Sequence, residues 1–152
     1  MKITKDKLLL LIIILIAFFL RFWQADRFPA GLNADEAAIG YNAYSLLLTG
    51  KDEHGNSWPI HFKSFGDYKP GLYFYLVIQL VKLFGLNIWA VRLPSLILGF
   101  VSVIFIMLLV KEIFLQDKIT NKYSLAAGFL LAISPWHLQF SRGGLEVNAA
   151  TT

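Results

Sequence analysis

Long apolar runs and one long polar stretch divide this chain. Residues 8–20 are apolar without a break, and residues 93–110 and 123–140 each contain eighteen residues with no formally charged side chain. A helix that crosses a bilayer needs about 20 mostly apolar residues, and arginine or tryptophan near its end can reach the interface. The pattern therefore predicts three membrane spans, at about 8–24, 93–112 and 123–140.

A fourth apolar stretch, residues 71–86, is shorter and contains Gln79 and Lys82. Its placement depends on the lysines, because positively charged residues concentrate on the cytoplasmic side of membrane proteins. The lysines next to the three spans form two clusters, Lys2, Lys5 and Lys7 before the first span and Lys111, Lys118 and Lys122 between the second and third. Both clusters are cytoplasmic only if 71–86 does not cross, and it then lies in the outer interface as an amphipathic helix or dips into the membrane and returns. If 71–86 crosses, the second cluster is outside.

The non-crossing topology predicts an all-α, multi-pass protein of the cell membrane with three transmembrane helices and a cytoplasmic N-terminus. Residues 25–92 form a long first extracytoplasmic loop with juxtamembrane amphipathic helices at about 34–48 and 70–86. A cleaved signal peptide is the alternative for the first span. The residues after its apolar run, Arg-Phe-Trp-Gln at 21–24, do not form a small-x-small cleavage site.

The composition excludes other classes of protein. The 152 residues are 57% hydrophobic and 16% charged, with a mean hydropathy of +0.59. A soluble fold of this size would expose large apolar patches, and disorder requires low hydrophobicity. The chain has no cysteine, which rules out disulfides and a cysteine zinc site. The net charge of +4 comes from lysines beside membrane spans, so it does not indicate nucleic acid.

Two acids begin the polar stretch. Asn33 and Glu36 have the spacing of a helix capping box, and Asp35 suits the positive first turn of the same helix. A helix start is therefore the simple explanation of both acids. Because they follow directly on a membrane span in an outer loop, Asp35 is also a candidate base for a bound hydroxyl.

Three cations and one further acid are candidates for a binding site. Lys69-Pro70 is expected to begin the second outer helix, where an ammonium either anchors the interface or binds phosphate. Arg92 lies at the mouth of the second span and has a simple explanation as a membrane-edge residue. Arg142 lies outside, against the orientation rule, which favours binding of a lipid phosphate. Glu146 follows four residues later, so a surface ion pair with Arg142 is the alternative.

No metal or nucleotide signature is present in the sequence. His54, His61 and His137 are too scattered for a metal-ligand pattern. The chain has no phosphate-binding loop, no dinucleotide glycine fingerprint and no serine-hydrolase motif. We therefore predict no metal site and leave the cofactor unknown.

Four segments in order resemble the N-terminal part of integral-membrane C-type glycosyltransferases, in the group of protein O-mannosyltransferases and lipid A aminoarabinose transferases. They are Asn-Ala-Asp-Glu-Ala-Ala-Ile-Gly-Tyr at 33–41, Tyr-Lys-Pro-Gly-Leu-Tyr-Phe-Tyr-Leu at 68–76, the segment 83–95 with Arg-Leu-Pro-Ser, and Ile-Ser-Pro-Trp-His-Leu-Gln-Phe-Ser-Arg-Gly-Gly-Leu-Glu at 133–146. The resemblance covers about residues 8–150. No single segment is specific, but their order and spacing are.

The resemblance implies roles for the candidate residues. Asp35 matches the family's catalytic base and Glu36 its neighbouring acid. Lys69 and Arg142 match cations at the donor phosphate, to which we add Arg92, and Glu146 matches the acid of the second outer loop. Some relatives carry a glutamate near a metal where this chain has Tyr68, so a divalent metal has only weak support.

The implied function is transfer of a sugar from a polyprenyl-phosphate donor to an acceptor hydroxyl on the extracytoplasmic side, with inversion. The expected partners are that donor, membrane lipids and an acceptor that is a protein, a lipid or a glycan, but not nucleic acid. The family core has more spans, so residues 1–152 are expected to be the N-terminal part of the enzyme and inactive alone. The alternative is a non-catalytic membrane scaffold or assembly subunit that binds a partner through its outer loop.

Overall fold

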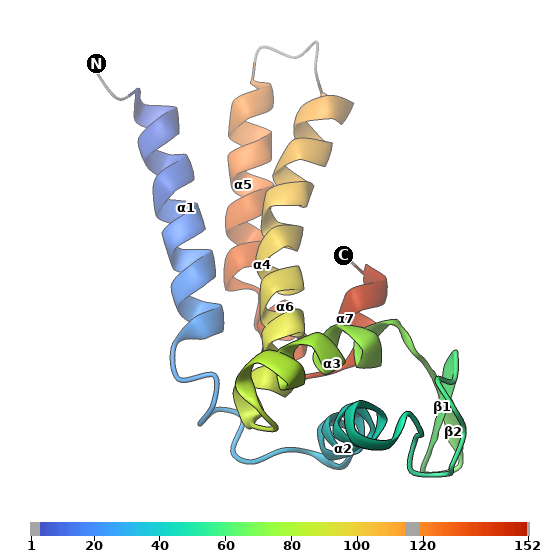
Figure 1. Ribbon diagram of the computed structural model, residues 1–152. Helices are drawn as coiled ribbons and strands as arrows, with labels where there is room; N and C mark the ends of the chain where they lie inside the picture. Colours follow the sequence, from blue (N-terminus) through green and yellow to red (C-terminus); the bar gives the residue numbers. More distant parts are fainter. Residues whose placement is uncertain (1–3, 115–118, 152) are drawn as a thin grey trace.

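The computed structural model describes residues 4–114 and 119–151, and most of them are helical (Figure 1). The helices are α1 (Lys5–Phe22), α2 (Ala34–Thr49), α3 (Leu72–Phe84), α4 (Ile88–Ile113), α5 (Thr120–Ile133), α6 (Pro135–Arg142) and α7 (Glu146–Thr151). An antiparallel hairpin of β1 (His61–Ser64) and β2 (Asp67–Pro70) connects α2 to α3. The fold has two parts, a bundle of three helices and a layer of shorter elements at one end of it.

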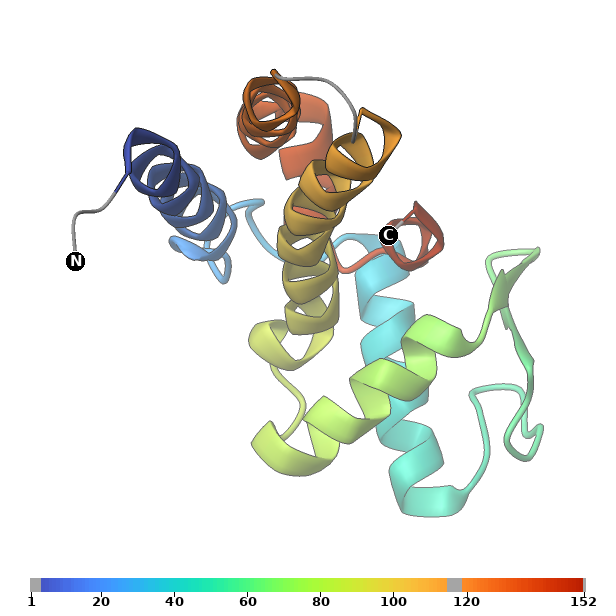
Figure 2. The ribbon, with the colours of Figure 1, turned by 90° about the horizontal axis from the view of Figure 1, so that it is seen from above.

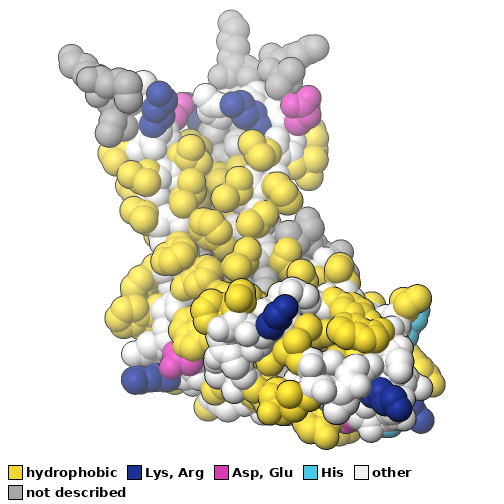
Figure 3. All heavy atoms as spheres, viewed as in Figure 1, with side chains coloured by type: hydrophobic (Ala, Val, Ile, Leu, Met, Phe, Trp, Pro, Cys, Tyr) yellow, Lys and Arg dark blue, Asp and Glu magenta, His cyan; other side chains and the backbone are white. Residues whose placement is uncertain are grey.

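The bundle consists of α1, α4 and α5, which run side by side (Figure 1). Its core is small and apolar, and its buried members are Ile13, Ala17, Val103, Met107 and Ala132. The outer surface is also apolar, as Figure 3 shows for one face, with Lys and Arg side chains near the end where α1 begins. Leu15, Phe18 and Leu108 are each more than half exposed. Such a large exposed apolar surface is typical of contact with lipid.

Among the described residues, only α4 is both long enough and apolar enough to cross a membrane, by length and composition. The three predicted spans are therefore not all confirmed. Helix α1 has 18 residues but includes Lys5, Asp6, Lys7 and Arg21. The prediction of one continuous helix over 123–140 is wrong, because α5 ends at Ile133 after 14 residues and α6 begins at Pro135.

The break between α5 and α6 follows from proline chemistry. Pro135 has no backbone N–H and restricts the residue before it, so a helix normally stops there and a new one can begin. The break frees backbone carbonyls at the end of α5. The guanidinium of Arg21, which is buried, donates hydrogen bonds to the carbonyls of Leu131 (3.4 Å) and Ala132 (3.3 Å). Arg21 therefore holds α1 against the end of α5 inside the bundle.

The second part contains α2, α3 and the hairpin. Figure 1 shows α3 lying across the end of the bundle, and Figure 2 shows α2 and α3 crossing each other with the hairpin beyond them. Its core is Ile39, Ala43, Leu46, Phe62, Tyr73, Phe74, Val77, Ile78, Val81, Ala90 and Val91. The start of α1, the last turn of α4 and the start of α5 lie at the opposite end of the molecule. That 71–86 does not cross the membrane stays a prediction.

The hairpin replaces the predicted start of the second outer helix. Lys69 and Pro70 belong to β2, and α3 begins only at Leu72. The two-residue connection consists of Phe65 (φ 48°) and Gly66 (φ 90°). Positive φ at both positions is the geometry of a type I′ turn, which matches the twist of paired strands. The prediction that Lys69-Pro70 occupies a first helical turn is therefore wrong.

Candidate functional site

The acidic pair begins α2 as the sequence predicts. The side chain of Asn33 accepts a hydrogen bond from the backbone N–H of Glu36 (2.8 Å), and the Glu36 carboxylate accepts one from the N–H of Asn33 (3.0 Å). This reciprocal capping box is confirmed. It fixes the first turn of the helix, and Asp35 is therefore held at a defined position on the outer face of that turn, with its side chain 46% exposed.

Glu36 is the buried member of the pair and connects three parts of the chain. Its carboxylate accepts hydrogen bonds from Arg92 Nε (2.7 Å) and from the backbone N–H of Gly144 (2.8 Å). Burial opposes ionisation of Glu36, but the hydrogen bonds from Arg92, Gly144 and Asn33 outweigh it and hold its pKa below the ordinary value. Glu36 therefore ties α2 to α4 and to the loop before α7.

Arg92 is placed as a scaffold residue and not as a phosphate ligand. It is completely buried at the start of α4. Two of its N–H groups donate to Glu36, and the others donate to the backbone carbonyls of Ala25, Pro29 and Gly31. All five donors of the guanidinium are used. Arg92 therefore has no free N–H for the donor phosphate that it was expected to bind.

Arg142 is also occupied by backbone. Its guanidinium donates to the carbonyls of Leu20 (2.7 Å), Trp23 (2.9 Å) and Phe28 (2.9 Å), at the end of α1 and in the turn that follows. A cation there satisfies carbonyls that a helix end leaves unpaired. The alternative of a surface ion pair with Glu146 is not found, because Glu146 lies near Lys69 instead. Arg142 therefore fixes the end of α1 and the turn that follows it.

Lys69 reaches the acids from the hairpin. In β2 it is the buried position between two exposed neighbours, and it pairs in register with the buried Phe62 of β1. Phe62 stacks on Phe74 of α3 with ring centroids 4.0 Å apart, which anchors this face of the hairpin to the core. Because side chains alternate along a strand, Lys69 is directed inward with Phe62. The hairpin thus turns the ammonium group toward the start of α2.

Three charged side chains from separate elements meet there, and we call Asp35, Lys69 and Glu146 the charged cluster. Lys69 Nζ lies 2.5 Å from Asp35 Oδ1 and 3.8 Å from Glu146 Oε1. The Lys69 side chain is only 10% exposed. Glu146 Oε2 is buried and accepts no hydrogen bond from any residue in the described part of the chain. A buried oxygen without a donor indicates a place for a bound group or water.

A cavity of about 410 Å³ lies at the start of α2, and it is not lined by Asp35, Lys69 or Glu146. Its walls include Asn33, Glu36 and Leu145, which are sequence neighbours of Asp35 and Glu146, together with Gln139 of α6. Within residues 4–114 and 119–151, no group of three or more His, Asp or Glu side chains is placed to hold a metal ion. The charged cluster itself offers an ammonium and two carboxylates to a polar ligand.

Comparison with known proteins identifies the family. The family model for dolichyl-phosphate-mannose-protein mannosyltransferases matches residues 68–152, more than half of the chain. The chain belongs to this family. No curated protein and no solved structure matches it. Membership in the mannosyltransferase family implies a glycosyltransferase type of activity and a membrane location at the family level.

The family match includes Lys69, Arg142 and Glu146 but begins after Asp35 and Glu36. The structure connects Asp35 to the matched region, because Lys69 contacts Asp35 directly. Sequence reasoning missed the Arg92–Glu36 pair and the bond from Gly144, which join residues 56 and 108 positions apart. No local signal in the sequence predicts contacts over such separations. In the sequence, the capping box was a sufficient explanation of Glu36, so nothing pointed to Arg92 and Gly144 as its partners.

Proposed function

We propose that this member of the mannosyltransferase family takes part in transfer of a sugar from a polyprenyl-phosphate donor to an acceptor hydroxyl on the extracytoplasmic side. One observation carries the proposal: Lys69 lies between Asp35 and Glu146, with an ammonium-to-carboxylate distance of 2.5 Å to the first. An acid that can take a proton and a cation that can stabilise a leaving phosphate are thus adjacent. Sugar transfer from a phosphate requires both groups.

Asp35 is the proposed general base. Its carboxylate is partly exposed and can reach an incoming hydroxyl group. The hydroxyl oxygen forms a bond to the anomeric carbon, its proton passes to Asp35, and the bond from that carbon to the phosphate oxygen breaks. The electron pair of the broken bond leaves on the polyprenyl phosphate. Attack opposite to the leaving group inverts the anomeric centre.

Lys69 is the proposed ligand of the departing phosphate. A buried ammonium has few competing waters, so its attraction to developing negative charge is stronger than at an exposed site. Glu146, whose Oε2 accepts no hydrogen bond from the described residues, is suited to accept one from a sugar or acceptor hydroxyl. Arg92 and Arg142 support the site through the backbone and through Glu36.

The bilayer is the proposed route of the donor. A lipid-linked sugar needs no soluble nucleotide pocket, and none of the nucleotide-binding motifs is present. The charged cluster lies at the end of the bundle that the lysine pattern places outside. A donor whose lipid chain remains among the helices would present its phosphate at that end. The acceptor is a hydroxyl group of a protein, a lipid or a glycan.

The test is the substitution Asp35→Asn in the full-length protein, assayed in membranes with a radiolabelled polyprenyl-phosphate sugar. Removing a general base typically lowers turnover by a factor of about 10² to 10⁴. We expect a loss of turnover in this range while donor binding changes little. Asp67→Asn serves as the matched control, because Asp67 is an exposed acid of the neighbouring hairpin. Its turnover should stay within about twofold of the original.

Unimpaired turnover in the Asp35→Asn protein would remove the proposed base. Lys69→Met provides an independent arm, since it should weaken both donor binding and turnover. If the folded original protein turns over no lipid-phosphate sugar at all, the alternative of a non-catalytic scaffold is favoured. A size-exclusion profile equal to that of the original protein establishes that each variant is folded.

A further inference from the structure

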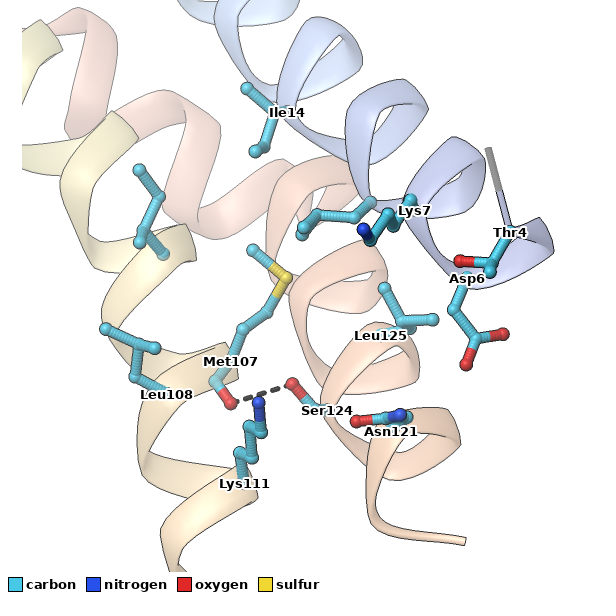
Figure 4. A pocket seen from close by; sticks show the side chains of 12 residues that line it. Thr4, Asp6, Lys7, Ile14, Met107, Leu108, Lys111, Asn121, Ser124 and Leu125 are labelled. Carbon is cyan, nitrogen blue, oxygen red and sulfur yellow. Dashed lines mark hydrogen bonds between the residues drawn. The ribbon is translucent and has the colours of Figure 1, made fainter. Parts of the chain in front are cut away.

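A second cavity lies at the opposite end of the bundle from the charged cluster. It has a volume of about 440 Å³ and is formed by α1, α4 and α5 (Figure 4). Figure 1 shows that α1 leans away from α5 toward this end. The apolar walls come from all three helices and include Leu10, Ile14, Ile104 and Leu125. A volume in this range is typical of sites for small molecules or parts of lipids.

The rim of this cavity carries two lysines from different helices. Lys7 belongs to the first turn of α1 and Lys111 to the last turn of α4. Figure 4 shows both side chains extending from their helices toward the space between them. In the described part of the chain, neither lysine has an ion-pair partner within 4.0 Å. Asp6 also lines the cavity, but it is paired with neither of them.

We propose that this cavity binds an anionic phospholipid of the cytoplasmic leaflet. The phosphate lies between Lys7 and Lys111, and the first part of one acyl chain lies against the apolar walls. The amide of Asn121, which is exposed at the same rim, can donate to the headgroup. Basic rims over apolar gaps between membrane helices are suited to acidic headgroups, and the lysine pattern places this end where such lipids concentrate.

Charge complementarity decides the occupant. Both lysines are exposed and neither forms an ion pair in the described part of the chain, so a lipid without net charge leaves their positive charge unbalanced. An anionic phospholipid supplies a net negative charge and carries its own apolar chains. Ser124 is not needed for the headgroup, because its hydroxyl donates to the carbonyl of Met107 (2.7 Å). The two lysines are therefore the groups on which recognition depends.

Native mass spectrometry of the delipidated full chain tests the proposal. The chain is titrated with phosphatidylglycerol and with phosphatidylcholine of the same acyl chains. We expect one phosphatidylglycerol to bind. The Lys7→Gln/Lys111→Gln double variant should bind it at least about tenfold more weakly. The matched control is Lys51→Gln/Lys63→Gln, which removes two exposed lysines of the outer loop and should bind like the original.

Ile104→Trp fills the apolar part of the cavity and keeps both lysines, so it should also weaken phosphatidylglycerol binding. Equal binding of both lipids, or equal phosphatidylglycerol binding by the original chain and the Lys7/Lys111 double variant, would overturn the proposal. A photoreactive residue at position 10 identifies the occupant in cell membranes. A cross-link to an anionic phospholipid supports the proposal, and a cross-link to polypeptide overturns it.

Discussion

At the scale of single residues, one buried ion pair organises the end of the molecule that carries the charged cluster. Arg92 and Glu36 are both almost completely buried, and each is surrounded by hydrogen-bond partners. Such a pair adds little net stability compared with apolar residues, but removal of one partner leaves a buried charge. The pair therefore fixes the positions of the elements it joins more than it adds stability. It holds the start of α2, and so Asp35, against the start of α4.

Arg92→Met should destabilise the protein strongly, because Glu36 would lose two charged hydrogen bonds inside the fold. The expected loss is about 3–5 kcal/mol in the free energy of unfolding. Denaturation in detergent, followed by circular dichroism, measures it. In the double variant Arg92→Met/Glu36→Gln the buried charge is gone, so the loss should be clearly smaller than the sum of the single variants. Additive losses would show that the two side chains are not coupled.

The pKa of Glu36 predicts how stability depends on pH. It lies below the ordinary value of about 4.5, so the folded state binds the proton less readily than the unfolded state. The stabilisation is complete above that ordinary value and is lost as the pH falls through the lower folded pKa. The melting temperature should therefore be steady from pH 7 to about pH 5 and fall in more acidic solution. Glu36→Gln should flatten that fall, and an unchanged acid profile would assign it to other groups.

At the scale of elements, local chemistry predicted some features and tertiary contacts decided others. The capping box at Asn33 and Glu36 is local, and it gave the start of α2 correctly. The hairpin was missed because Lys69-Pro70 before an apolar run also suits a helix start. The one sequence signal for the hairpin was the glycine of its Phe65-Gly66 turn. The break at Pro135 was missed because hydropathy averages over it, while Arg21, far away in the chain, stabilises the freed carbonyls.

Two glycines of the bundle should respond differently to alanine. At Gly99 a Cβ would lie 2.5 Å from the Cβ of Ser141, whose position the backbone of α6 fixes. At Gly128 it would lie 2.4 Å from both Cγ and Sδ of the buried Met107, whose side chain would have to take another rotamer inside the core while its backbone stays in place. Alanine itself favours a helix over glycine by about 1 kcal/mol. We expect a loss of melting temperature for both variants, larger for Gly99→Ala than for Gly128→Ala. The reverse order would contradict the close contact of α4 with α6.

At the scale of the whole molecule, the charged cluster exists only because distant segments converge. Asp35 comes from α2, Lys69 from β2 and Glu146 from the beginning of α7. Their residue types and order along the chain could be predicted through the family resemblance. Their distances could not, because they depend on the hairpin and on the bond from Gly144 to Glu36. The proposed sugar transfer therefore requires that Asp35, Lys69 and Glu146 lie on the same side of the membrane.

Cysteine labelling tests that condition directly, since the chain has no cysteine of its own and each introduced thiol is the only one. Lys63 and Leu86 flank α3, Val147 follows Glu146, and Lys122 lies in the first turns of α5; all four are exposed. An impermeant maleimide should label cysteines at 63, 86 and 147 in intact cells, and the cysteine at 122 only after permeabilisation. Opposite sides for 63 and 86 would mean that α3 crosses. Opposite sides for 63 and 147 would separate Lys69 from Glu146 and exclude a shared sugar site.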